Sequence, residues 1–101
     1  KETIMAVVVT NTWVRPNTEV DFYEPSESEK NYITINFIDN DKYSVISSLY
    51  SDDDLTKIRV VSFEDAATRD EWKADSTVKQ FQSDRKTYNT NNSISHTASF
   101  S

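Results

Sequence analysis

Alternating apolar and polar positions along the chain predict four strands. Residues 6–15 are rich in Val, Thr and Trp, which favour extended backbone, and this run ends at Pro16. Residues 43–50 and 56–63 also alternate, and the acidic corner at 52–54 between them predicts an antiparallel hairpin. Residues 94–100 alternate in the same way and predict a last strand.

Between the hairpin and the last strand, residues 64–89 carry a helical pattern with a break. Val78, Phe81, Arg85 and Tyr88 follow one another at helical spacing and form one stripe. Asp75 lies just before this stripe, where its side chain is able to cap a helix. The pattern therefore predicts a helix in two parts.

Residues 26–42 carry two conflicting signals. Ser26 and Glu29 form a capping box, which predicts the start of a helix. Ile33, Ile35 and Phe37 alternate instead, as in a strand. A strand here would give a meander of order β-β-β-β-α-β. We favour the helix, because the order then becomes β-α-β-β-α-β, an α+β fold with the ferredoxin-like arrangement and an antiparallel sheet.

In the ferredoxin-like arrangement both helices cover one face of the sheet and leave the other face bare. Only 36% of the residues are hydrophobic, so the core is thin and a partner surface is expected to complete it. A homodimer or a larger protein assembly would supply that surface. The residues expected to bury the partner are Val7, Val9, Trp13, Val45, Leu49, Ile58 and Val60.

Composition excludes several classes of function. The 101 residues include no Cys and no Gly, which removes thiolate chemistry and the glycine-rich phosphate loops. One His cannot build a multi-histidine metal site within one chain, and we expect no cofactor and no metal. The net charge of −6 argues against nucleic acid as a partner, and no apolar run is long enough to span a membrane.

The charged clusters along the chain are expected to be solvated or paired with one another. The acidic corners at 39–41 and 52–54 could hold a calcium ion, but they are expected to be solvated turns, and the first does not fit a calcium-binding loop. Arg59 and Arg85, with Lys86, are expected to pair with the surrounding acids rather than bind an anion.

The C-terminal half resembles the dimeric α+β barrel superfamily, which includes the antibiotic-biosynthesis monooxygenases. The matching pattern runs from the strand at 60–63 through the acidic helix with Trp72, the break at Asp75 and the second helical part to Ile94. From residue 60 to residue 94 the pattern covers 35 residues. The absence of Gly departs from the family, whose turns commonly use it, and puts the loop lengths and the register in doubt.

The resemblance implies a dimer in which two sheets pack face to face. Some members of the superfamily oxidise aromatic polyketides without a metal or a cofactor, in a cavity between the sheet and its helices. For this chain the resemblance implies Asn11, Trp72 and His96 as the residues of such a site. Other members have no known activity. Core packing for Trp72 and a structural role for His96 are the alternatives.

Residues 13–16, 22–23 and 51–56 also resemble segments of small uncharacterised proteins of tailed bacteriophages. This second resemblance implies a virion or accessory role, either in the cytoplasm of the host cell or in the virus particle. We therefore expect a small acidic, non-catalytic interaction or structural domain. The alternative is a cofactor-independent monooxygenase or another small-ligand enzyme of the barrel type.

The domain itself is expected to span residues 5–101. Met5 begins an apolar run that is typical of a natural start leading directly into a strand. Residues 1–4 are then a remnant of expression, and they take no part in the candidate sites.

Overall fold

The computed structural model describes residues 6–100, so the expected remnant at 1–4 lies outside the described residues. Its four strands are β1 (Val7–Val14), β2 (Tyr43–Tyr50), β3 (Thr56–Phe63) and β4 (Ser95–Phe100). They form one antiparallel sheet in the order β2-β3-β1-β4. This α+β architecture is consistent with a ferredoxin-like arrangement and confirms the four predicted strands.

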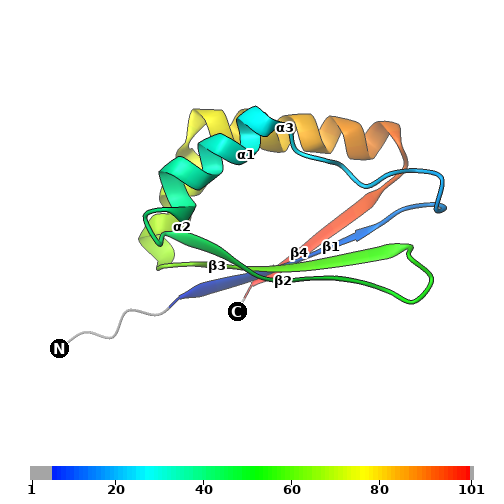
Figure 1. The fold of residues 1–101 in the computed structure, drawn as a ribbon, viewed down its shortest axis with the longest axis horizontal. Coiled ribbons are helices and arrows are strands. Elements are labelled where there is room, and N and C mark those ends of the chain that lie inside the picture. Colours follow the sequence, from blue (N-terminus) through cyan, green and yellow to red (C-terminus); the bar gives the residue numbers. More distant parts are fainter. Residues whose placement is uncertain (1–5, 101) are drawn as a thin grey trace.

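The helices form a second layer on one face of the sheet (Figure 1). They are α1 (Glu27–Ile33), continued by the π-helix η1 (Thr34–Ile38), then α2 (Ala66–Ala74) and α3 (Ser76–Asn91). Within residues 6–100 no element covers the other face of the sheet. The predicted two-part helix is confirmed, because α2 and α3 are separated by Asp75 alone.

Residues 26–42 are helical, which settles the conflict between the two sequence signals. Ser26 caps α1, because its side chain accepts a hydrogen bond from the backbone N–H of Glu29 at 3.2 Å. The β-branched part then continues as η1, in which the N–H of Asp39 donates to the carbonyl of Thr34 at 2.8 Å. The wider turn of η1 accommodates apolar residues that are not spaced for an α-helix.

The core lies where η1 and the helical break meet the sheet. It consists of the buried residues Val9, Phe37, Tyr43, Val61, Phe63 and Val78. Trp72 of α2 packs against this cluster, with its ring 4.7 Å from that of Tyr43 and 5.0 Å from that of Phe37. Aromatic contacts therefore hold the helix layer on the sheet at this end.

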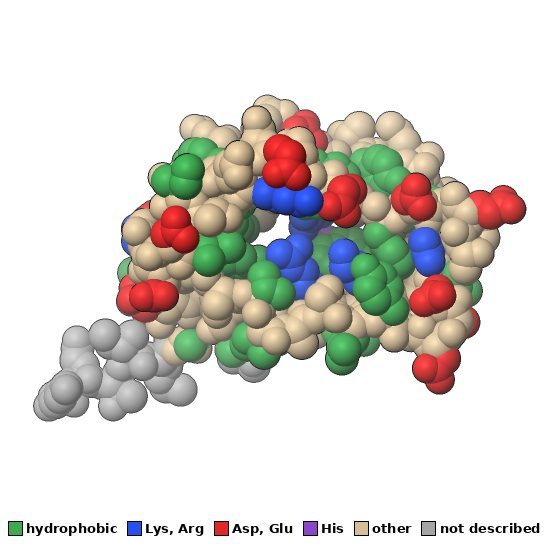
Figure 2. Space-filling view, in the orientation of Figure 1, with side chains coloured by type: hydrophobic (Ala, Val, Ile, Leu, Met, Phe, Trp, Pro, Cys, Tyr) green, Lys and Arg blue, Asp and Glu red, His purple; other side chains and the backbone are tan. Residues whose placement is uncertain are grey.

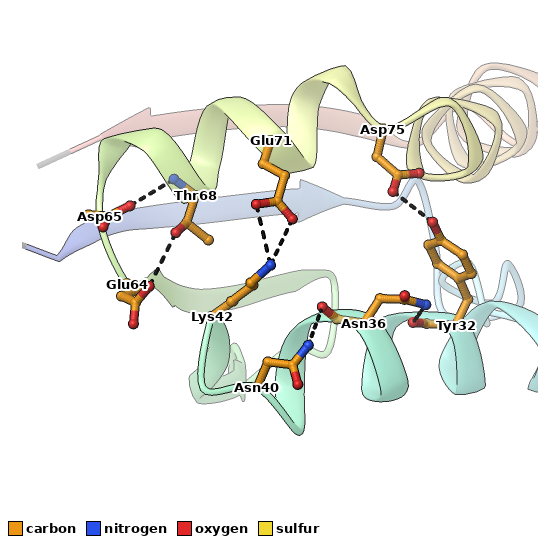
Figure 3. Close-up of polar contacts among 9 residues, drawn as sticks. All are labelled: Tyr32, Asn36, Asn40, Lys42, Glu64, Asp65, Thr68, Glu71 and Asp75. Atoms are coloured by element: carbon orange, nitrogen blue, oxygen red, sulfur yellow. Dashed lines mark hydrogen bonds and ion pairs between the residues drawn. The ribbon is translucent and has the colours of Figure 1, made fainter.

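Polar contacts connect the helices with one another and with the sheet (Figure 3). The hydroxyl of Tyr32 in α1 donates to Oδ2 of Asp75 at 2.6 Å. Oδ1 of the same carboxylate accepts from the backbone N–H groups of Thr77 and Val78, so Asp75 caps α3 and anchors α1. Nζ of Lys42, just before β2, lies 3.0 Å from Oε2 of Glu71 in α2.

Three turns use left-handed backbone, which glycine would normally supply. Asp41, Asp54 and Ser93 have φ of 58°, 60° and 57°. Ser93 follows α3, where the N–H of Ile94 donates to the carbonyl of Asn89 at 2.8 Å and closes a Schellman motif. In left-handed backbone the Cβ atom crowds the following carbonyl oxygen, so each of these three residues is less stable there than glycine would be.

Replacing Ser93 by glycine is expected to stabilise the protein by about 1 kcal/mol, because it removes the left-handed strain at the end of α3. For a domain of this size, that gain raises the melting temperature by about 4–8 °C, which calorimetry measures. Ser83→Gly, at an exposed position inside α3, is the matched control and should lower the melting temperature. A lower melting temperature for Ser93→Gly would contradict this account of the turn.

Candidate functional site

A cavity of about 550 Å³ lies between the sheet and the helices α2 and α3. Its floor is formed by β1, β3 and β4, and its roof by the two helices. A second cavity of about 300 Å³ adjoins it on the side of α1, and Tyr43, Arg59, Trp72, Gln82 and Arg85 line both. Figure 2 shows the opening between the helix layer and the sheet.

The three residues implied by the barrel resemblance all line the larger cavity. Asn11 comes from β1, His96 from β4 and Trp72 from α2. Nε2 of His96 lies 2.9 Å from Oδ1 of Asn11. Because an amide oxygen only accepts, Nε2 carries the proton of the neutral imidazole and Nδ1 is left as the acceptor.

The rings of Trp13 and His96 are stacked, with centroids 5.0 Å apart and planes 13° apart. Trp13 and His96 are paired across β1 and β4, which places both side chains on the helix side of the sheet. The stack and the hydrogen bond to Asn11 fix the orientation of the imidazole. Trp72 is held differently, in the aromatic cluster of the core, so its ring serves both as core and as cavity wall.

The surroundings of His96 favour its neutral form. Partial burial at the cavity wall lowers its pKa, and the positive charge of Arg85 lowers it further. Since the folded-state pKa lies below the ordinary value of 6.5, the unfolded chain binds this proton first. The contribution of His96 to stability is therefore present above pH 6.5 and is lost as the pH falls below it.

The Arg85→Gln substitution is expected to raise the pKa of His96 toward its ordinary value, because it removes a nearby positive charge. An NMR titration of the single imidazole follows this pKa directly. Lys79→Gln, which removes an exposed cation of α3 outside the cavity, is the control and should leave the pKa unchanged. An unchanged pKa in Arg85→Gln would show that Arg85 does not act on His96.

The cationic character of this cavity was not predicted from the sequence. Arg85 pairs with a carboxylate as expected, because one of its terminal nitrogens lies 3.8 Å from Oε2 of Glu29. The guanidinium of Arg85 also lies 5.2 Å from the ring centre of Tyr23 and 5.5 Å from that of Trp13. For Arg59 and Lys86 the expectation was wrong, since in the described part of the chain neither makes an ion pair.

The signal for this cluster was present in the sequence. Arg59 alternates with the inward residues Val61 and Phe63 on β3, and Arg85 belongs to the apolar stripe of α3. Two arginines at inward positions of different elements predict that their side chains meet between the layers. The lowered pKa of Arg85 reflects burial first and the charge of Arg59 second.

The seven residues expected at a partner interface do not share one face, because the register of the sheet separates them. Val9 and Trp13 are each only 6% exposed and lie under the helices, with Val7 packed against the same core. Val45 is paired with Val61 and therefore shares the helix side, although it is 43% exposed.

The rest of that set lies on the opposite side of the sheet, which no helix covers and which we call the open face. These residues are Leu49, Ile58 and Val60. A β-bulge between Val45 and Ser47 reverses the alternation of β2, so that Leu49 is paired with Ile58. Of the seven predicted interface residues, these three are the ones available to a partner on the open face.

The open face carries no charged side chain. Alternation and pairing place on it short aliphatic and hydroxyl residues from all four strands. These are Val8, Thr10, Thr12 and Val14 of β1, Thr56, Ile58, Val60 and Ser62 of β3, Ser44, Ser47 and Leu49 of β2, and Ser95, Thr97 and Ser99 of β4. In the whole chain, by contrast, 28% of the residues are charged.

Two other kinds of site were sought in residues 6–100. No group of three or more His, Asp or Glu side chains there is arranged to hold a metal ion. None of the helices that the structure describes has both the length and the apolar character needed to cross a membrane.

Comparisons with known proteins find no match, since no family model, no curated protein and no solved structure is significantly similar to the chain. The resemblance to the dimeric α+β barrel superfamily therefore stays a prediction. What the structure defines is an α+β domain with an uncharged open sheet face and a cavity between its two layers.

Proposed function

We propose that this protein is a small non-catalytic interaction domain that self-associates through the open face of its sheet. The observation that carries the proposal is the complete absence of charge on this face in a strongly charged chain. An uncharged face lets two copies of a protein with net charge −6 approach without burying an unpaired charge.

The size of the open face is compatible with a dimer. Strands about 4.8 Å apart that rise about 3.3 Å per residue give a four-stranded face on the order of 450 Å² in projection. Two such faces bury on the order of 1,000 Å², which is near the lower limit for a specific interface. Aliphatic side chains supply the apolar area, among them Ile58 on the inner strand β3, which is 38% exposed, and Leu49 on the edge strand β2, which is 64% exposed.

Face-to-face packing of two sheets would produce the dimeric α+β barrel that the superfamily resemblance implies. A larger assembly built from the same contact would fit the virion or accessory role implied by the bacteriophage resemblance. The two forms differ in symmetry, because a dimer closes on itself and a larger assembly requires a further contact.

Light scattering over protein concentrations from about micromolar to millimolar tests the proposal. A mass of twice 11.7 kDa is expected for the dimer, and a higher discrete mass for an assembly component. A folded monomer at every concentration would refute self-association.

A second candidate function is the binding of a small ligand in the cavity on the opposite side of the sheet. It is favoured by the convergence of Asn11, Trp72 and His96 on one cavity. The hydrogen bond between Asn11 and His96 leaves Nδ1 of the imidazole free to accept a proton. Dioxygen uptake with a bound aromatic substrate and no added cofactor would extend this candidate to the oxygenase class.

A further inference from the structure

The larger cavity collects positive charge in a chain that is acidic overall. The chain has 17 Asp and Glu against 11 Lys and Arg, yet no Asp or Glu lines this cavity. Its basic side chains come from β3, α2 and α3, and they are Arg59, Arg69, Lys73, Arg85 and Lys86. In Figure 2, Lys and Arg gather at the opening between the layers, while Asp and Glu are spread around it.

Most of these cations have no ion-pair partner among residues 6–100. Among residues 6–100 the ion pairs are made by Lys30, Lys42 and Arg85, so the other four cavity cations have no carboxylate within 4.0 Å. Glu29, an acid that lines the adjoining cavity, is already engaged by Arg85 and by the hydroxyl of Tyr23, whose oxygen lies 3.0 Å from Oε1 of Glu29.

Burial, and after it the repulsion between neighbouring cations, lowers the pKa of two basic side chains at or beside the cavity. Lys57, beside the cavity, has a lowered pKa because of its burial and then because of the charges of Arg59 and Arg85. The pKa of Arg85 is lowered by burial and by Arg59, although Glu29 opposes this effect. Keeping like charges together at a partly desolvated wall is unfavourable unless an anion joins them.

The cavity also has aromatic walls. Trp13, Phe63 and Trp72 present aromatic surface to it, and its volume of about 550 Å³ falls in the range of small-molecule sites. Asn89, which is 6% exposed, also lines the cavity, and its Oδ1 has no hydrogen-bond partner in the described part of the chain.

We propose that this cavity binds a small organic anion that combines a carboxylate, phosphate or sulfonate group with a flat aromatic body. The guanidinium of Arg59 and the neighbouring cations hold the anionic group, since guanidinium and carboxylate or phosphate match in geometry. The aromatic walls hold the body. The inference rests on the ligand-binding candidate above and is independent of self-association.

Calorimetric titration with a matched pair of probes tests this inference. 2-Naphthoate carries the negative charge, and 2-naphthamide has nearly the same shape without it. We expect 2-naphthoate to bind at least ten times more tightly than 2-naphthamide and more tightly than inorganic phosphate, with an affinity that falls as salt is added. Equal affinity for the two naphthyl probes would overturn the anion preference but keep a ligand cavity, whereas no binding of either would overturn both.

Two variants locate the binding. The Arg59→Gln substitution is expected to weaken the binding of 2-naphthoate by about 10- to 100-fold and to leave the affinity for 2-naphthamide unchanged. Lys86→Gln changes an exposed position of α3, so it should weaken the binding of 2-naphthoate while the protein stays folded. Lys79→Gln lies outside the cavity and is the control, because it should leave the affinity for 2-naphthoate unchanged. Undiminished 2-naphthoate binding in both cavity variants, or phosphate binding as tight as that of 2-naphthoate, would refute the proposed site.

Discussion

Replacing Ile58 by aspartate is expected to convert the self-associated protein into a folded monomer. Ile58 lies on β3, one of the two inner strands of the sheet, and is 38% exposed, so the monomer has room to leave the new carboxylate in water. In a face-to-face dimer the carboxylate would be buried without a partner on each copy. Each such charge makes association less favourable by about 3–5 kcal/mol, which raises the dissociation constant more than a hundredfold.

Light scattering and circular dichroism together measure this effect. Ile35→Asp is the matched control, because Ile35 is 65% exposed on η1 in the helix layer and should leave the mass unchanged. Val60→Asp, on the same strand and face as Ile58, should give the same result if it folds. A well-folded Ile58→Asp protein that keeps its dimeric mass would exclude the open face as the interface.

The Phe37→Ala substitution is expected to have the largest effect on stability. Phe37 is 1% exposed and packs edge-on against Trp72, with ring centres 5.0 Å apart. Because the cavity keeps the layers apart elsewhere, this cluster supplies much of the contact between helices and sheet. The substitution should cost about 3–5 kcal/mol out of a total stability of about 5–15 kcal/mol.

Thermal and urea unfolding measure this loss, which corresponds to a drop in melting temperature of at least about 12 °C. Ile35→Ala serves as the control, since it also shortens a large apolar side chain, two residues away and at an exposed position. It should change the free energy of unfolding by less than about 0.5 kcal/mol. A drop of only a few degrees for Phe37→Ala would show that the cluster does not hold the layers together.

Period-two patterning predicted the strands well, because the helices cover only one face of the sheet and neighbouring residues of a strand point to opposite faces. The conflict at residues 26–42 was resolved by the capping box at Ser26, whereas the β-branched residues that favoured a strand instead occupy η1. Local propensity is the weaker signal there, because a π-helical turn brings Phe37 into the core and leaves Ile35 exposed.

The division of residues between the two sheet faces could not be predicted from the sequence. Alternation shows that Val9 and Val8 point in opposite directions, but not which direction the helices cover. The bulge between Val45 and Ser47 leaves no clear mark in the sequence and reverses the faces along β2. The convergence of Asn11 and His96 likewise depends on the pairing of β1 with β4.

The strict alternation of the inner strands has a consequence for how this domain tolerates mutation. Along β1 and β3, neighbouring residues belong to different surfaces, one facing the cavity and the other the open face. Point substitutions are therefore expected to impair ligand binding and association separately. A one-residue insertion or deletion within either strand would exchange the two surfaces at once, as the bulge already does in β2. Length changes in natural variants should therefore be confined to the turns.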